Sequence, residues 1–546
     1  KLRADELLSA IKALESIQLL AYRLEAYAYN SFAAYGDDKS QALLSKIEAK
    51  ETVILKDAIF FELELNLLND TAFKKLKDSN VLADYRHWLG MVRIYKPNQL
   101  SEPEEKILAE KTVTSSAAFV RLFDSIRARA RFDYRGKELG ESEVVSLLSD
   151  DDRQVRKDAA HSLTKGLEPH AENINFIYNN LIADKEISDR LRGYTYPEEA
   201  KFKGHELKPE WVDAMINAAT QNYQMVASYY QLKKRLLGYD KLYVWDRYAP
   251  IGKEKSRYTF DQAQEIVLSA FNQFSPEKAK LTKSMFDESR IDAQLRPGKR
   301  GGAYCIAGGP PEPVYVLTNY SGKSRDVSTL AHELGHAVHS LLAQKGNSVF
   351  NFHPTTPMAE TASVFAEILV FDYLKKQPIS DEDKLALLMR KIEDSFATIF
   401  RQVSMFEFER EAHRRRRSEG ELDLKTTSEI WQKQIVRMFG DSVDLTEGHK
   451  YWWTYVTHFF HSPFYVYSYA WAELQVLALY SKYLEEGDKF VPTYFEVLKS
   501  GGSRPPVEIM TKAGFDVTSS DFWETGIKIL KGWIKEADEL ASHVKA

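Results

Sequence analysis

The chain has 546 residues, of which 44% are hydrophobic and 28% are charged, an ordinary composition for a globular protein. Its formal net charge of −5 gives no reason to expect nucleic acid or an anionic membrane surface as a partner. The single cysteine, Cys305, excludes an intrachain disulfide, and without a membrane-length apolar run or a signal-peptide pattern we expect a cytoplasmic protein.

Apolar residues at helical spacing run through most of the chain, so we expect a mainly α-helical fold. Near the N-terminus they define one helix face, made of Leu7, Ile11, Leu14, Ile17, Ala21 and Leu24. The same spacing recurs near the C-terminus at Trp523, Ile527, Leu530 and Ile534. We interpret both stripes as core-facing.

A proline-containing break at residues 96–103 ends the first helical block. Ser101 is expected to cap the helix that starts with Glu102 and Pro103. A short extended stretch is expected at residues 128–134, and the acidic residues 149–152 indicate another helix start. We therefore divide the chain into an N-terminal helical region, residues 1–130, and a second region, residues 131–546.

Strand signals are few and lie in the middle of the chain. Residues 242–248 alternate between apolar and polar side chains, whereas 303–307 and 314–318 are short runs bounded by glycine and proline. The last two runs come just before a predicted helix. We therefore expect a small β-sheet beside that helix.

This helix carries the most specific chemical signal, His332-Glu333-Leu334-Gly335-His336. Two histidines four residues apart lie on one helix face, about one turn apart, and can hold one Zn²⁺. Glu333 can reach a metal-bound water, and the small Gly335 lets other groups approach closely. Asp326 is expected to cap the helix.

A catalytic zinc needs a third protein ligand and an open position for water. The candidate is Glu360, which follows His336 by 24 residues and lies in the predicted first turn of a second helix. Glu367 is two turns further along the same face, where it either orients a ligand or is a solvated glutamate. His339 either lines the cleft or is a hydrogen-bonded structural histidine.

The residues around this motif resemble the oligoendopeptidase F branch of the thimet-oligopeptidase-like metallopeptidases. The resemblance runs from about Leu82 to about Leu530, and the first eighty or so residues carry no motif. It is carried by an ordered set of segments at residues 100–106, 296–305, 317–320, 325–339, 360–363, 458–460, 463–470 and 498–505. The order of these segments is far more specific than the histidine–glutamate motif alone.

The resemblance implies a mainly α-helical, two-lobed shell around a deep channel with zinc at its floor. It also implies endopeptidase action on short peptides. His332, His336 and Glu360 would be the ligands of one zinc ion per chain, and Glu333 would be the catalytic base.

The same resemblance implies that the aromatic segment supplies groups that stabilise the reacting carbonyl oxygen. His458, Tyr465 and Tyr469 look like those groups, and the choice among Tyr465, Tyr467 and Tyr469 stays open. The alternative is that these tyrosines belong to a large aromatic core, where their hydroxyls merely find partners.

Chemistry connects these residues in one mechanism. Zinc lowers the pKa of a bound water, and Glu333 takes a proton from that water as it attacks the scissile carbonyl. Donors from residues 458–469 then stabilise the oxyanion. An exposed strand edge at residues 314–318 could pair with the backbone of the peptide substrate.

The leading functional prediction is a zinc-dependent endopeptidase that hydrolyses internal bonds of short oligopeptides. A zinc carboxypeptidase or dipeptidyl carboxypeptidase is the alternative, because those enzymes use the same motif, and a non-hydrolytic peptide-binding protein ranks third. Gly322-Lys323-Ser324 lacks the earlier glycine of a phosphate-binding loop. The four arginines at 414–417 lie among glutamates and indicate a solvated helix face. The oligomeric state is not predicted.

Overall fold

The structure is a computed structural model that describes residues 2–252 and 257–544. It is 74% helical with small sheets, which confirms the mainly α-helical prediction. A two-lobed shell around a deep channel stays a prediction. Within the described residues, no helix combines the length and the apolar character that crossing a bilayer requires.

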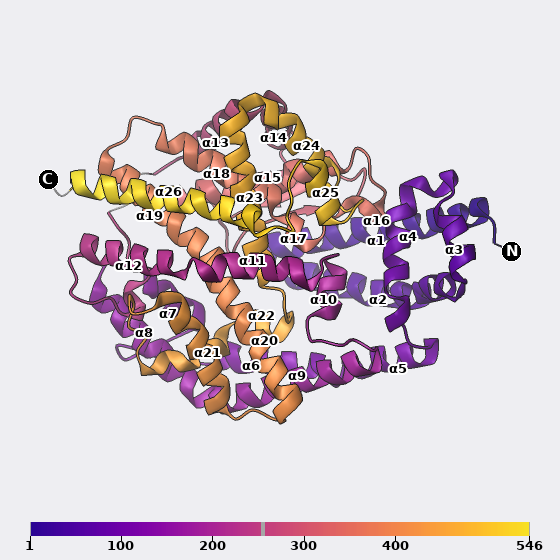
Figure 1. Ribbon diagram of the computed structural model, residues 1–546, viewed down its shortest axis with the longest axis horizontal. Helices are drawn as coiled ribbons and strands as arrows, with labels where there is room; N and C mark the ends of the chain where they lie inside the picture. The colour runs from indigo at the N-terminus through magenta and orange to yellow at the C-terminus, as the bar shows by residue number, and fades with distance from the viewer. Residues whose placement is uncertain (1, 253–256, 545–546) are drawn as a thin grey trace.

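The N-terminal helices lie at one side of the molecule and build a small core of their own (Figure 1). They are α1 (Ala4–Tyr35), α2 (Asp38–Leu67), α3 (Asp70–Lys77) and α4 (Arg86–Ile94), with the 3₁₀ turn η1 (Asn80–Tyr85) before α4. Trp88 of this core stacks on Phe350 from the later part of the chain, with ring centroids 4.5 Å apart. This aromatic contact joins the N-terminal core to the rest of the protein.

A second group of helices follows and occupies the middle and lower parts of the view in Figure 1. Its elements are α5 (Glu102–Thr112), α6 (Ser116–Arg129), the hairpin β1 (Phe132–Tyr134) and β2 (Lys137–Leu139), α7 (Glu141–Ser146), α8 (Arg153–Leu167), α9 (Ala171–Leu191), α10 (Glu199–Gly204), α11 (Pro209–Gln221) and α12 (Tyr223–Leu237).

The remaining elements follow later in the chain and include the predicted metal helix, α15. They are α13 (Phe260–Phe274), α14 (Pro276–Asp287), β3 (Ile291–Asp292), β4 (Tyr304–Ala307), β5 (Val314–Leu317), α15 (Ser324–Ala343), α16 (Val349–Phe352), α17 (Thr356–Ala359), α18 (Thr361–Lys375), α19 (Asp381–Phe396), the π-helical turn η6 (Ala397–Arg401), α20 (Gln402–Glu419), α21 (Leu424–Phe439), α22 (His458–His461), α23 (Tyr467–Glu486), α24 (Val491–Lys499), α25 (Pro506–Lys512) and α26 (Ser520–Val544).

The two strands predicted just before α15 form, as β4 and β5, and they pair antiparallel. The short strand β3 adds to β5 in parallel, so the strand order is β3-β5-β4. The small sheet packs against α15, as expected from the sequence. Because β5 is the central strand, β4 keeps a free edge among the described residues.

Two of the predicted helix starts are confirmed. Ser101 is the N-cap of α5, and its backbone N–H donates to Glu104 at 2.9 Å. Asp152 is the N-cap of α8, where its carboxylate accepts from Gln154 N at 2.6 Å. Asp326 is not the N-cap of α15, because that helix begins at Ser324; its carboxylate still accepts from the N–H of Lys323 at 3.1 Å.

The strand predicted at residues 242–248 is wrong. The chain forms the 3₁₀ turn η5 (Val244–Asp246) instead, and only Tyr243 makes an isolated bridge, to Asp444. The physical reason is Asp246, which is fully buried and which Arg153 and Arg156 both contact. A turn directs this carboxylate at the two guanidinium groups, whereas a strand would alternate its side chains across two faces.

The core-facing interpretation of the two apolar stripes is right for α26 and only partly right for α1. Trp523, Ile527 and Leu530 of α26 are buried. In α1, Leu7 is buried but Ile17 is 47% exposed. A 32-residue helix is about 48 Å long, and the N-terminal core includes only residues of its first part, up to Leu14.

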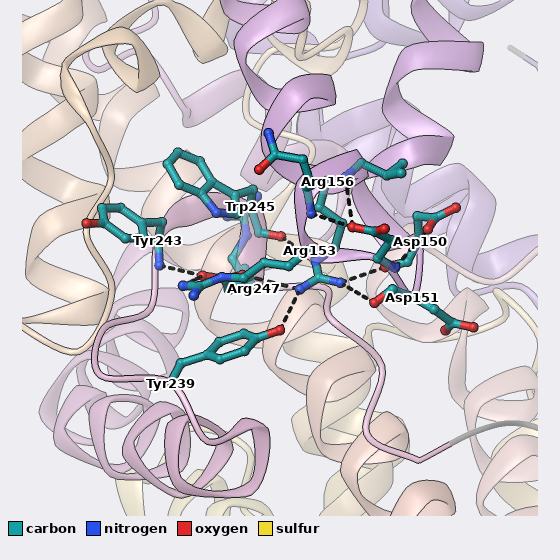
Figure 2. A network of polar contacts seen from close by, with 12 residues as sticks. Asp150, Asp151, Arg153, Arg156, Tyr239, Tyr243, Trp245 and Arg247 are labelled. Carbon is teal, nitrogen blue, oxygen red and sulfur yellow. Dashed lines mark hydrogen bonds and ion pairs between the residues drawn. The ribbon is translucent and has the colours of Figure 1, made fainter.

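A buried polar network joins α8 to the segment around η5 (Figure 2). The Arg156 side chain is 1% exposed and lies among backbone carbonyls and the Asp246 carboxylate. Its guanidinium donates to Asp150 O at 2.7 Å and to Trp245 O at 3.1 Å, and it lies 3.3 Å from Asp246 Oδ1. Arg153 contacts the same carboxylate from a more exposed position.

We expect Arg156→Met to lower the free energy of unfolding by about 3 kcal/mol, because it leaves buried carbonyls and part of a buried carboxylate unpaired. Arg153→Met is the matched control: it faces the same Asp246, but its side chain is 37% exposed, so its effect should be about 1 kcal/mol or less. Denaturant unfolding of both variants measures the difference. Equal losses of unfolding free energy in the two variants would contradict the larger contribution expected of the buried Arg156.

Candidate active site

Helix α15 carries His332, Glu333 and His336. The two imidazole rings lie 4.9 Å apart, centroid to centroid, as expected for neighbours one helical turn apart. Both histidines are half-buried, whereas Glu333 is only 6% exposed. The apolar remainder of the helix, including Leu334 and Val338, is buried and fixes the orientation of this face.

Glu360 reaches the histidines because α18 packs directly on α15. A Cβ atom at Gly335 would lie 2.5 Å from the carbonyl oxygen of Ala362, so the two backbones touch at this point. Glu360 is the N-cap residue of α18, and its carboxylate accepts a hydrogen bond from Ser363 Oγ at 2.7 Å. The close approach expected at Gly335 is therefore present.

The three side chains converge in the way a tetrahedral metal site requires. His332 Nε2 and His336 Nε2 each lie 3.3 Å from Glu360 Oε2. Ligand atoms around a tetrahedral zinc ion with bonds of about 2.0 Å are about 3.3 Å apart, so the donor set fits the ion. With three protein donors, a fourth position is left for water or substrate. Among the described residues, this is the one group of three or more histidine, cysteine, aspartate or glutamate side chains whose ligand atoms lie close enough together to hold a metal ion.

Glu367 orients the first histidine from behind. Its Oε1 lies 2.5 Å from His332 Nδ1, which leaves Nε2 free to face Glu360 and His336. The alternative of a solvated glutamate is therefore wrong.

A buried charge chain extends from Glu367 into the protein. Lys391 Nζ lies 3.7 Å from Glu367 and 3.6 Å from Glu473, and Ser395 donates to Glu473 at 2.7 Å. Although burial opposes ionisation, the positive charge of Lys391 keeps the pKa of Glu367 below its usual value. No sequence motif marks Lys391 or Glu473, which come from α19 and α23.

Glu333 lies between two cavities that together run along α15. One, of about 400 Å³, borders the C-terminal half of the helix; the other, of about 670 Å³, borders its N-terminal half. Both are lined by Ala303, His332 and Glu333. Burial raises the pKa of Glu333 above its ordinary value, which makes this carboxylate a better proton acceptor.

The strand that borders the smaller cavity is β4, not β5. Residues of β4 line the smaller cavity, whereas β5 is hydrogen-bonded on both sides. The hypothesis of a free edge at residues 314–318 is therefore wrong, because β3 covers one side of that strand and β4 covers the other. Cys305 is half-buried in β4, and burial raises the pKa of its thiol well above the usual value, which keeps the thiol protonated.

The sequence left open the choice among Tyr465, Tyr467 and Tyr469, and the structure distinguishes them. Tyr467 is fully buried, and its hydroxyl lies 2.6 Å from His205 Nδ1. Tyr465 and Tyr469 form a group with His458: Tyr469 OH is 3.1 Å from His458 Nε2, and the two tyrosine rings are 5.3 Å apart.

The electrostatic surroundings of this group favour neutral side chains. Burial raises the pKa of both Tyr465 and Tyr469, and the nearby charge of Glu360 adds to the effect. Burial lowers the pKa of His458. Two protonated phenols close to the candidate metal ligands are suitable hydrogen-bond donors for a developing oxyanion.

His339 is both a cavity-lining and a structural residue. It borders the smaller cavity but is only 5% exposed. Burial lowers its pKa to about 3, so it is neutral, and the backbone of Ala359 accepts a hydrogen bond from it. It lies outside the group formed by His332, His336 and Glu360.

Comparison with known proteins identifies the class. Residues 146–529 match the family described as Peptidase family M3, and residues 64–132 match the one described as Oligopeptidase F. With the cluster of two histidines and a glutamate, these matches define a metallopeptidase of the oligopeptidase class. The chain belongs to peptidase family M3. The resemblance to oligoendopeptidase F drawn from the sequence is thereby confirmed.

The similarity extends over nearly the whole chain. Oligopeptidase PepF of Bacillus subtilis is 26% identical over 560 residues, covering 99% of this chain and 82% of that protein. A crystal structure from Chlamydophila abortus has a TM-score of 0.89 at 25% identity and covers 98% of this chain and 91% of that one. Oligoendopeptidase-F from Enterococcus faecium has a TM-score of 0.76 at 22% identity, covering 99% and 94%.

We expect Glu367→Gln to weaken zinc binding by about 10- to 100-fold, because it removes the charge that orients His332. Competition with a chromophoric chelator measures the dissociation constant without relying on activity. Asp372→Asn, on the same helix but ion-paired with Lys376, is the control and should bind zinc like the wild type. Unchanged zinc affinity in Glu367→Gln would contradict an orienting function.

Proposed function

We propose that this protein is a zinc-dependent endopeptidase that cleaves internal bonds of short oligopeptides. The observation that carries the proposal is the convergence of His332, His336 and Glu360 at the spacing of tetrahedral zinc ligands. The second support is Glu333, buried beside them at the junction of two cavities. The relatives named oligopeptidase and oligoendopeptidase support the same substrate class.

His332, His336 and Glu360 would hold the zinc ion, which when bound supplies the Lewis acidity that makes a water molecule reactive near neutral pH. Glu333 removes a proton from the attacking water and then delivers that proton to the leaving amine. Its low exposure supports this function, because a base shielded from solvent keeps the proton for the leaving group.

Tyr469, with Tyr465 and His458 beside it, donates hydrogen bonds to the carbonyl oxygen as negative charge develops there. The support is their grouping and their protonated state near Glu360. The substrate lies across Glu333, with its two sides in the two cavities. The free edge of β4 is the available partner for the substrate backbone.

We also propose that residues 131–546 form the catalytic region and that residues 1–130 form an N-terminal helical region, although Phe123 of α6 packs in the main core. The support is that every side chain assigned above lies beyond residue 300. The helices up to Ile94 have a core of their own, joined to the rest by the contact between Trp88 and Phe350.

The proposal is tested with internally quenched peptides of increasing length, blocked at both ends. Wild type should cleave the short members, lose activity with a chelator and regain it with zinc. Glu333→Gln should lose activity by at least about 10²-fold while still binding zinc, because the ligands remain. Glu382→Gln, an exposed glutamate of α19, is the control.

The other outcomes decide between functions. An enzyme that trims only free C-termini is a carboxypeptidase or dipeptidyl carboxypeptidase. Binding without cleavage of either kind of peptide would favour a peptide-binding protein. Full activity of Glu333→Gln would remove the glutamate base from the mechanism.

We expect Tyr469→Phe to lower kcat by about 10²-fold with little change in KM, because the donor acts mainly in the transition state. Tyr467→Phe is the matched control, since it removes a buried hydroxyl from the same helix that faces His205. Its kcat should be unchanged. Steady-state kinetics on one blocked peptide compares the two, and a normal kcat for Tyr469→Phe would exclude this hydroxyl.

A further inference from the structure

A buried glutamate lies behind the aromatic group and takes no part in the mechanism above. Glu409 is on α20 and is fully buried. Its Oε1 accepts a hydrogen bond of 2.9 Å from the backbone N–H of Phe464. Its Oε2 has no hydrogen-bond partner within the described parts of the chain. Burying a carboxyl group that makes a single hydrogen bond costs free energy of folding, so the bond to Phe464 is of particular interest.

The bonded residue, Phe464, has an unusual backbone. Its φ is +58°, in the left-handed region that non-glycine residues seldom adopt. The residue is fully buried, and its ring lies 4.6 Å from that of His413. Such a conformation persists only where the surroundings enforce it. Glu409 is one such constraint, because it binds the N–H of the strained residue itself.

The left-handed residue immediately precedes Tyr465. The chain turns here, with Tyr465 N donating to Ser462 O at 3.2 Å. Lys201 contacts the same turn, with Nζ 3.3 Å from Ser462 Oγ and 5.9 Å from the centre of the Tyr465 ring. The turn therefore sets the direction in which the Tyr465 side chain leaves the backbone.

Glu409 can accept the hydrogen bond from the N–H of Phe464 without being charged. Burial raises the pKa of Glu409 to about 8, against the opposing effects of the Phe464 hydrogen bond and the charge of Lys201. The carboxyl group is therefore mainly protonated at neutral pH. Glutamine has the same shape and an acceptor oxygen, whereas methionine has a similar shape and no acceptor.

We propose that Glu409 is a positioning residue for Tyr465: by holding the left-handed turn at Phe464, it keeps the Tyr465 side chain beside Tyr469 and His458. The inference rests on the proposed function, in which this group stabilises the oxyanion. Its effect reaches the reaction through the backbone, since Glu409 is bonded to Phe464 and not to any side chain of the candidate active site.

The test compares Glu409→Met, Glu409→Gln and Tyr465→Phe, together with the double variant Glu409→Met/Tyr465→Phe, on one blocked peptide. We expect Glu409→Met to lower kcat by about 10- to 100-fold, because a displacement near 1 Å is enough for such a loss. KM and zinc affinity should stay near the wild-type values. Glu409→Gln should retain most of the activity. Glu411→Met, which removes a surface partner of Arg414 on the same helix, is the control.

The double variant tests whether Glu409 acts through Tyr465. If Glu409 acts through Tyr465, Glu409→Met should cause no further loss of kcat in the Tyr465→Phe background. Suppose that Tyr465→Phe lowers kcat. The inference is then overturned if Glu409→Met has a normal kcat, or if the kcat losses of the two single variants multiply in the double variant. A normal kcat for Tyr465→Phe would overturn it together with the assigned function of Tyr465. If Glu409→Met does not fold, Glu409→Asp withdraws the carboxyl group by one methylene and has the same expectation.

Discussion

The backbone contact between α15 and α18 at Gly335 is the constraint on which the site depends. With no side chain at this position, the carbonyl of Ala362 comes within a distance that any Cβ atom would forbid. This contact brings Glu360 to within 3.3 Å of both histidines. The arrangement of the three candidate ligands is therefore a consequence of helix packing. The spacing of 24 residues along the chain matters only because it lets α18 return to that point.

Bringing charged side chains into a half-buried centre has an electrostatic cost that the protein offsets by pairing. Glu367 contacts His332, and Lys391 lies between Glu367 and Glu473. Each charge has an opposite neighbour, which is what buried ionised groups require. These charged side chains come from α15, α18, α19 and α23, so the orientation of the candidate ligand His332 depends on four helices. Substitutions in any of them can act on the centre without touching a ligand.

The aromatic segment shows how one short stretch serves two purposes. Tyr467 points into the core towards His205, while Tyr465 and Tyr469 gather with His458 near Glu360. Around a helix, residues two apart point in very different directions, so Tyr467 cannot share a face with Tyr469. The left-handed Phe464 breaks the regular path just before the helix and gives Tyr465 a direction that helical periodicity would not provide.

The sequence by itself determined the helical class, the helix that carries His332 and His336, and the small sheet before it, because these follow from local periodicity and short-range spacing. Capping residues such as Ser101 and Asp152 were predictable from the sequence for the same reason. The tertiary structure alone decided which strand has a free edge, which tyrosine leaves the site, and that Asp246 lies in a turn. It also revealed Lys391, Glu473 and Glu409, whose partners lie tens of residues away in the chain. Local patterns report the conformation of a segment, whereas burial and partner choice arise only when distant segments pack together.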